Sequence, residues 1–218
     1  MTIKRVAVIG AGGFAREVEW LIRDINQKEP IYEFVGFVVS DLAKLGEHDS
    51  RDRVLGDYDW LEKNDGTLDA LAIGIGDPQA RLKVGNDLSE RFPKFEWPVL
   101  AHPTVILDFK SSEVGRGSLL CAGTIGTVNI RIGSYSMVNL ACTLGHEAQI
   151  GRGSVLNPTV NVSGGVRLGE GVLVGTGAQL IQYVSIGDRA VVGAGAVVTK
   201  DVPAGETVIG VPAKPLRK

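Results

Sequence analysis

The chain has 218 residues, of which 44% are hydrophobic, and this is enough apolar material to bury a core. Its 23 Lys and Arg nearly balance its 25 Asp and Glu, which excludes the basic surface that nucleic-acid binding requires. The apolar run at the N-terminus breaks into glycines too soon for a signal peptide or a membrane span, so we expect a cytoplasmic protein with no membrane partner. Two cysteines are too few for a disulfide framework.

Residues 1–100 alternate between strand and helix patterns. Strand patterns lie at Lys4–Ile9, Phe34–Val39 and Leu71–Ile75, and residues 14–25 carry apolar side chains at helical spacing. This order favours a small α/β domain with a parallel sheet. A linker follows that contains three prolines, Pro93, Pro98 and Pro103.

The turn after the first strand is rich in glycine. Gly10, Gly12 and Ala15 fit the GxGxxG/A pattern of dinucleotide enzymes, but only about 100 residues precede the next domain, too few for a six-stranded dinucleotide fold. No acidic residue stands at the tip of the second strand before Asp41. The pattern is therefore weak evidence for hydride transfer.

From residue 114 onward the sequence changes to a repeat of six. Fifteen positions spaced six apart run from Val114 to Val198, and all but Gly126 are aliphatic. The fifth residue of each hexad is small or β-branched, which makes Cys142 a small buried hydrophobe; the second is Gly eight times and Asn twice, which we expect to supply positive φ. The period predicts a parallel β-helix with three hexads in each triangular coil. We place it at residues 101–218, with a short C-terminal tail.

Charged residues occur at the third position of the hexad too often for that side chain to face a narrow core. The chain must therefore turn a corner at this position and point the side chain outward. His146, the one histidine of the repeat, occupies such a corner. One edge, which carries Arg116, Ser134, Arg152, Glu170 and Asp188, is expected to be solvated. Another is uncharged: Ala122, Leu140, Pro158, Thr176 and Ala194. An uncharged edge is a candidate interface, so we expect a homotrimer in which His146 lies beside a neighbour's uncharged edge.

Five segments together resemble one family over nearly the whole chain: VAVIGAGGFAREV, LAIGIGDPQARL, His102-Pro103, LGHEAQIG and VIGVPAKPLRK. The family is that of the sugar O-/N-acyltransferases, hexapeptide-repeat enzymes related to the sialic acid O-acetyltransferase and to bacterial nucleotide-4-aminosugar N-acetyltransferases. The resemblance implies that the coil is left-handed. It also implies that residues 1–100 bind a nucleotide sugar and residues 101–218 carry out acyl transfer.

The resemblance assigns roles to matching residues. His146 would be the general base that takes a proton from the attacking amine, and Glu147 would fix its tautomer and stabilise the imidazolium. Acetyl-CoA would lie near Gly164, Thr176 and Ala194, with direct transfer and no metal. Simple corner packing is the alternative role of these small residues.

The resemblance also places the nucleotide sugar at the first turn. Gly12, Gly13 and Phe14 would hold its diphosphate at a helix N-terminus. Val155 is also expected at the cofactor by this matching. Three positions depart from the family pattern: Phe14 replaces a histidine, Val39-Ser40 replaces an acidic pair near the nucleotide, and Val155 stands where relatives often carry a second histidine that contacts the cofactor.

The favoured function is therefore acetyl transfer from acetyl-CoA to a nucleotide-linked 4-amino-4,6-dideoxy sugar in surface-glycan biosynthesis. O-acetylation of a sugar hydroxyl and a non-catalytic sugar-binding scaffold remain as alternatives. A carbonic anhydrase of the β-helix type is excluded, because the chain has three histidines and only His146 lies in the repeat, so three imidazole ligands cannot gather on a metal.

Overall fold

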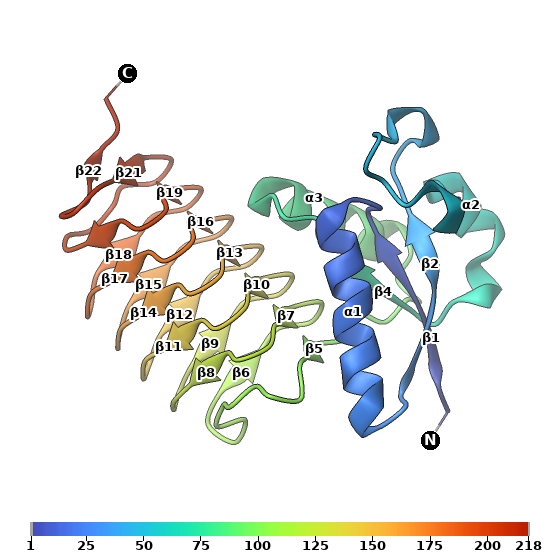
Figure 1. Cartoon of the computed structure of the whole chain (residues 1–218), viewed down its shortest axis with the longest axis horizontal. Coiled ribbons are helices and arrows are strands. Elements are labelled where there is room, and N and C mark those ends of the chain that lie inside the picture. The colour runs from blue at the N-terminus through green and yellow to red at the C-terminus, as the bar shows by residue number, and fades with distance from the viewer. Residues whose placement is uncertain (1, 218) are drawn as a thin grey trace.

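The structure, a computed structural model, describes residues 2–217 and divides into an α/β part and a long β-helix (Figure 1). The α/β part is built on one parallel sheet in the order β3-β2-β1-β4. Its strands are β1 (Lys4–Ile9), β2 (Tyr32–Val38), β3 (Val54–Gly56) and β4 (Ala70–Ile73). Its helices are α1 (Gly13–Lys28), α2 (Tyr58–Lys63) and α3 (Pro78–Arg91), with single 3-10 turns at Leu42–Lys44, Arg51–Arg53 and Asp65–Thr67.

Both faces of this sheet are covered, as parallel sheets require. Residues 6–9 of β1 are all buried, with α1 packed on one face and α3 on the other. The buried side chains of α1 recur at helical spacing: Ala15, Val18, Leu21, Ile22 and Ile25. The expected strands and first helix are present within a few residues of their predicted bounds, whereas β3, α2 and α3 were not predicted.

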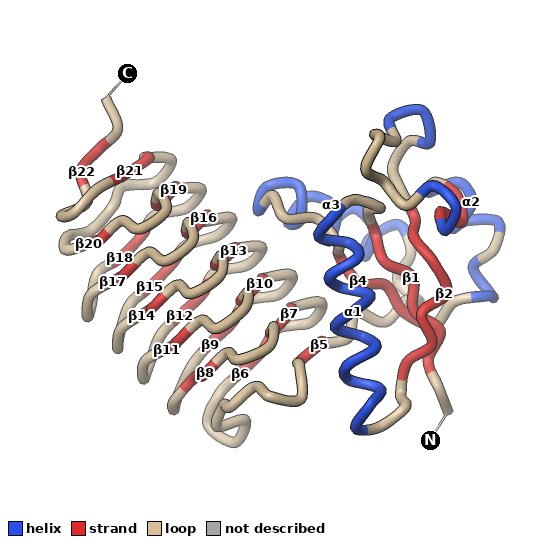
Figure 2. The backbone as a smooth tube through the Cα atoms, viewed as in Figure 1, coloured by secondary structure: helices blue, strands red, loops and turns tan. Residues whose placement is uncertain are grey.

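The β-helix consists of three sheets whose short strands recur in each coil and pair in parallel, except that β22 is antiparallel to β21 (Figure 2). Sheet I contains β5 (Leu100–Ala101), β7 (Leu119–Leu120), β10 (Met137–Val138), β13 (Val155–Leu156), β16 (Leu173–Val174), β19 (Val191–Val192), β21 (Thr207–Ile209) and β22 (Lys214–Pro215). Sheet II contains β8 (Ile125–Gly126), β11 (Thr143–Leu144), β14 (Asn161–Val162), β17 (Gln179–Leu180) and β20 (Val197–Val198). Sheet III contains β6 (Glu113–Val114), β9 (Arg131–Ile132), β12 (Gln149–Ile150), β15 (Arg167–Leu168) and β18 (Ser185–Ile186).

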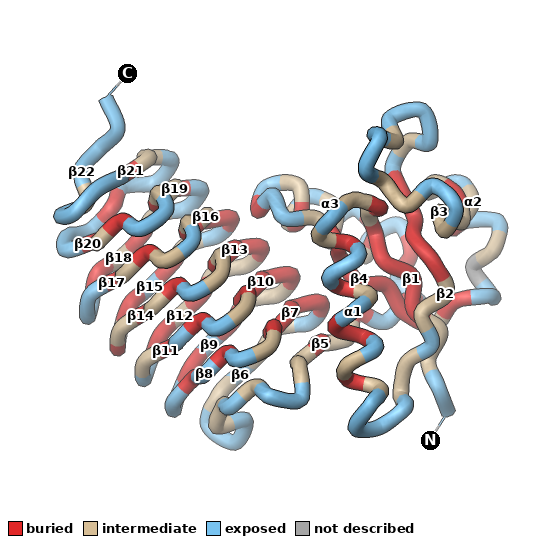
Figure 3. Tube along the Cα trace, viewed as in Figure 1, coloured by how far each residue is buried: buried red, intermediate tan, exposed pale blue. Residues whose placement is uncertain are grey.

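Partners among strands β6 to β20 are 18 residues apart, so the predicted coil length is confirmed there, whereas the first and last coils differ by one or two residues. Val155 pairs with Leu173, for example, and Leu168 pairs with Ile186. The aliphatic anchors and the small fifth residues form one continuous buried core along the prism (Figure 3). Cys142 is buried in this core, as predicted.

The predicted place of the positive φ angles was wrong. Left-handed residues stand at the fourth position of the hexad, as at Glu147 with φ 57°, and not at the second. Glycine is frequent at the second position because of crowding: a Cβ on Gly133 would lie 2.6 Å from the backbone nitrogen of Arg152 in the next coil. These glycines therefore allow coils to stack closely.

The α/β part packs on sheet I. Leu119, Met137 and Val155 of this sheet share a buried cluster with α1. Helix α3 follows the corner between sheets III and I, where Gln79 Nε2 donates to the Gly171 carbonyl at 2.7 Å. The edge that was predicted to be solvated is thus partly covered, because Arg152 on it donates to the Asn86 side chain of α3 at 2.5 Å.

The fully buried Arg81 joins the two parts. Its Nε–H donates to the Tyr135 carbonyl at 3.0 Å, and its Nη1 donates to the carbonyls of Ile73 at 2.9 Å and Ile75 at 2.8 Å. Burial lowers the pKa of this guanidinium to about 9, so it stays charged at neutral pH. Among the helices of residues 2–217, none is both long and apolar enough to cross a membrane.

Candidate active site

His146 lies at the corner between sheets II and III, just after β11. Its side chain is 46% exposed, and its Nδ1 is hydrogen-bonded to Glu147 Oε2. An ionised carboxylate can only accept, so Nδ1 carries the proton and the lone pair of Nε2 is left available. The imidazole is therefore in the tautomer that a general base requires.

Glu147 is held in place from the preceding coil. Its second carboxylate oxygen, Oε1, accepts a hydrogen bond from Asn129 Nδ2 at 3.3 Å. The hydrogen bond with His146, and then that with Asn129, lower the pKa of Glu147 below its ordinary value of 4.5. Asn129 was not predicted as a site residue, although it stands 18 residues before Glu147 and hence on the same edge.

Gly164 lies directly beneath the His146 ring in the next coil. A Cβ on Gly164 would overlap Nε2 and Cε1 of the imidazole, and the N–H of Gly165 donates to the His146 carbonyl at 2.8 Å. The absence of a side chain at Gly164 thus lets the ring lie flat against the edge. Of the residues expected near the acyl donor, Gly164 is the one that lies against His146 within a single chain.

Thr176 and Ala194 lie on a different edge, the corner between sheets I and II, where both are exposed. Within one chain they do not meet His146. Val155 is fully buried between sheet I and α1, so its side chain cannot contact a cofactor, and we remove it from the candidate site. Val155 lies on the face of sheet I that α1 covers, and the six-residue period alone does not indicate which face is covered.

The glycine turn between β1 and α1 is partly enclosed by the loop of residues 40–53. Position 10 favours glycine because its φ is 108° and because a Cβ there would lie 3.0 Å from the Gly74 carbonyl oxygen. The loop is held by the N–H of Ser50, which donates to the Ala11 carbonyl at 3.0 Å, and by Arg16 Nη1, which donates to the His48 carbonyl at 2.6 Å.

Charged groups from the helix and the loop meet at this turn. The Nη2 of Arg16 lies 3.8 Å from the position of a Cβ on Gly13, and Asp49 Oδ1 lies 3.3 Å from that of Gly12. The first turn of α1 has no acidic residue, and its N-cap, Gly12, supplies no side-chain cap, so backbone N–H groups are open to an anion. Arg16, which sequence reasoning missed, brings a positive charge to this turn, and Asp49 brings a negative one.

The glycine turn and His146 belong to different sides of the chain. The α/β part covers sheet I, and the corner of His146 is the one opposite that sheet, between sheets II and III. The corner between sheets I and II is the one beside α1, where Ala122 and Leu140 line a small pocket with residues of that helix. One chain therefore does not join its nucleotide turn to its own histidine.

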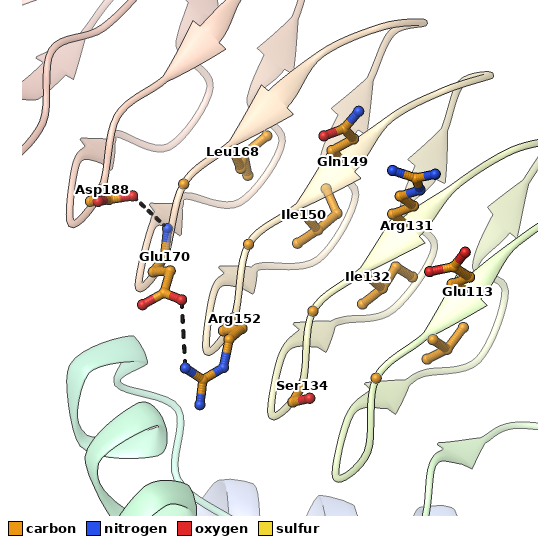
Figure 4. A pocket seen from close by; sticks show the side chains of 15 residues that line it. Glu113, Arg131, Ile132, Ser134, Gln149, Ile150, Arg152, Leu168, Glu170 and Asp188 are labelled. Atoms are coloured by element: carbon orange, nitrogen blue, oxygen red, sulfur yellow. Dashed lines mark hydrogen bonds and ion pairs between the residues drawn. The ribbon is translucent and has the colours of Figure 1, made fainter.

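A groove on the β-helix lies apart from the candidate base. It has a volume of about 610 Å³ and follows sheet III and the neighbouring corner (Figure 4). Two of its charged side chains form an ion pair, in which Arg152 Nη1 lies 3.6 Å from Glu170 Oε1, and the backbone N–H of Glu170 donates to Asp188 Oδ1 at 2.9 Å. Among residues 2–217, no group of three or more His, Cys, Asp or Glu side chains is placed so that it could hold a metal ion.

Comparisons with known proteins cover the same two parts. Residues 5–88 match the PglD N-terminal domain family, and residues 165–200 match the bacterial transferase hexapeptide (six repeats) family. A comparison with curated protein sequences gave no match.

Solved structures match the whole chain. WeeI from Acinetobacter baumannii AYE is 32% identical with a TM-score of 0.83, over 99% of this chain and 100% of that one. PerB from Caulobacter crescentus, in complex with CoA and GDP-perosamine, is 31% identical with a TM-score of 0.86, over 99% of each chain. A histidine-to-asparagine variant of perosamine N-acetyltransferase from the same organism, also with CoA and GDP-perosamine, is 29% identical with a TM-score of 0.87, over 100% of this chain and 99% of that one. With an α/β domain followed by a left-handed parallel β-helix, the protein is an acyltransferase and belongs to the hexapeptide-repeat sugar acyltransferase family.

Proposed function

We propose that this protein transfers an acetyl group from acetyl-CoA to the amine of a nucleotide-linked 4-amino-4,6-dideoxy sugar, with His146 as general base. The observation that carries the proposal is the hydrogen bond between His146 Nδ1 and Glu147, which leaves Nε2 free above Gly164. A GDP-linked sugar is the first substrate to test, because similar solved structures hold CoA and GDP-perosamine. The proposed setting is cytoplasmic synthesis of a surface glycan.

In the proposed reaction the amine nitrogen attacks the thioester carbonyl while His146 Nε2 accepts a proton from it. The carbon–sulfur bond then breaks, CoA leaves as the thiolate, and the imidazolium returns the proton to the sulfur. A base in this position contributes about 10²- to 10⁴-fold in rate. Glu147 stabilises the imidazolium that forms between the two proton transfers.

We further propose that the active site is completed between chains of a homotrimer. Residues 1–100 of one protomer bind the nucleotide through the glycine turn and Arg16, while residues 101–218 of a neighbour supply His146. The separation of the two sites within one chain supports this arrangement. The uncharged corner with Thr176 and Ala194, beside α1, then faces the neighbour's His146, so both edges line the acetyl-CoA groove.

The test is thiol release from acetyl-CoA with UDP-, dTDP- and GDP-linked 4-amino-6-deoxy sugars, for the wild type and His146→Ala. We expect turnover on one of them and a loss of about 10²-fold or more in the variant, with CoA binding retained. Sialic acid and other hydroxylated sugars form the second arm. Turnover on those alone would replace amine transfer with O-acetyl transfer, and CoA binding without turnover on any sugar would indicate a binding scaffold.

A further inference from the structure

Tyr183 combines a left-handed backbone with an exposed aromatic ring. Its φ is 65°, a region that bulky residues rarely adopt, and 71% of the residue is exposed. Its N–H donates to the Gly164 carbonyl at 3.1 Å, and its ring lies where a Cβ on Gly165 would be. A strained, exposed aromatic residue at this position calls for an explanation outside the core.

A second tyrosine of the repeat, Tyr135, has contacts within the chain that explain its position. Tyr135 also has a left-handed backbone, with φ 61°, but it is fully buried. Its ring meets Trp97 edge-on at 5.4 Å between centroids, and its hydroxyl is 2.7 Å from Ser89 Oγ. Among residues 2–217, by contrast, no group forms a hydrogen bond with the Tyr183 hydroxyl.

Tyr183 and His146 border the same glycine pair from opposite sides. The imidazole comes from the preceding coil and covers Gly164, while the phenol ring comes from the following coil and covers Gly165. Coils are about 4.8 Å apart, so the backbones of His146 and Tyr183 are about 10 Å apart along the edge. Both rings reach toward the coil between them, where the missing side chains of Gly164 and Gly165 leave room for them.

We propose that the Tyr183 ring is a binding wall for the pantetheine arm of CoA, a step that rests on the proposed function. With the thioester held at His146, the rest of the donor must continue along an edge, and the exposed Tyr183 ring borders the same glycine pair as the base. A phenol ring offers an apolar face for the methylenes and amide planes of that arm, and a hydroxyl at its rim.

The test compares Tyr183→Gly with Tyr183→Phe in the full-length protein, with CoA binding measured by isothermal titration calorimetry. Glycine accepts φ 65° and removes only the ring, so we expect the Kd for CoA to rise about 5- to 20-fold. Phenylalanine keeps the ring and should stay within about two-fold of the wild type. The matched control is Arg189→Gly, which changes an exposed residue with φ 59° on the corner between sheets III and I. In turnover, Tyr183→Gly should raise the KM for acetyl-CoA and leave the KM for the sugar unchanged.

Three results would overturn the inference. An unchanged Kd in Tyr183→Gly would show that the ring does not contact the donor. A shift in assembly state, measured by mass photometry, would show that Tyr183 serves an interface between chains. If the wild type itself binds no CoA, the proposed function fails together with the inference, whereas a wild type that binds and turns over beside an unaffected Tyr183→Gly leaves the function intact.

Discussion

The imidazole of His146 occupies the space that a side chain on Gly164 would need, one coil further along the β-helix. Other corners of the same kind carry alanine, as at Ala122 and Ala194, so the backbone itself accepts a Cβ there. The requirement for glycine at position 164 comes from the ring. The resting position of the proposed base is therefore determined by a residue that takes no part in the chemistry.

We predict that Gly164→Ala lowers kcat about 10-fold or more, because the added methyl group displaces the imidazole. Its melting temperature should remain close to that of the wild type. A double-mutant cycle with His146→Ala provides the measurement: once the ring is absent, Gly164→Ala should cost little more activity. Equal losses in both backgrounds would mean that the methyl group acts on substrate binding and not on His146.

Glu147 should increase the rate without adding a pKa of its own to the pH dependence of kcat/KM. Its pKa is lowered by the hydrogen bonds from His146 and Asn129, so it is ionised throughout the range from about pH 7.5 to 9. Glu147→Gln should reduce kcat/KM by a constant factor of about 10 to 100 over that range, which is less than a buried carboxylate partner would contribute. A factor that varies tenfold between these pH values would contradict this assignment. Asn129→Ala should give a smaller loss in the same direction.

Arg16 should determine affinity for the nucleotide part of the substrate. Its guanidinium lies beside the N-terminus of α1, where a diphosphate would gain both a charge-assisted contact and the backbone N–H groups. Arg16→Ala should raise the KM for the nucleotide sugar about 10-fold or more, with the KM for acetyl-CoA unchanged. Arg23→Ala, on the exposed side of the same helix, is the control. An equal effect of both substitutions would point to general electrostatic attraction.

The parts of the fold that were predictable are those with a local, repeated signal. The six-residue period determines which side chains enter the prism, and with it the coil length and the outward position of His146. The contact between His146 and Gly164 follows from the same arithmetic, since 18 residues separate neighbours on an edge.

Contacts that join distant segments were not predictable in this way. The hydrogen bond from Arg81 to the Tyr135 carbonyl links residues 54 positions apart, and no period connects them. The burial of Val155 depends on which sheet receives α1, and the six-residue period does not determine this. A signal lay in the residue before each aliphatic anchor, which is apolar at Leu119, Met137, Val155 and Leu173 of sheet I. Arg16 was missed for a related reason, because the loop of residues 40–53 that shapes its surroundings carries no periodic pattern.

The two cysteines should be unreactive in the folded protein. Burial raises the pKa of Cys121 to about 12 and that of Cys142 to about 11, so at pH 8 the thiolate fraction is about 10⁻³ or less. A disulfide dye should therefore detect no protein thiol in the native state and two per chain in guanidinium. A rapid reaction of one thiol in the native protein would show that one of these side chains is accessible, and it would have to be subtracted from every thiol-release assay.

Arg81 should contribute more than any other residue to the packing of the α/β domain on the β-helix. Arg81→Met retains much of the side-chain volume but leaves the carbonyls of Ile73, Ile75 and Tyr135 without their donor. Because buried acceptors that lose a charged donor cost several kcal/mol together, we expect the free energy of unfolding to fall by about 3 kcal/mol. Urea unfolding at one fixed protein concentration measures the change, and Arg189→Ala, on an exposed corner, should stay within about 0.5 kcal/mol of the wild type. If the methionine variant is as stable as the wild type, apolar packing alone joins the α/β domain to sheet I, and the buried charge has another purpose.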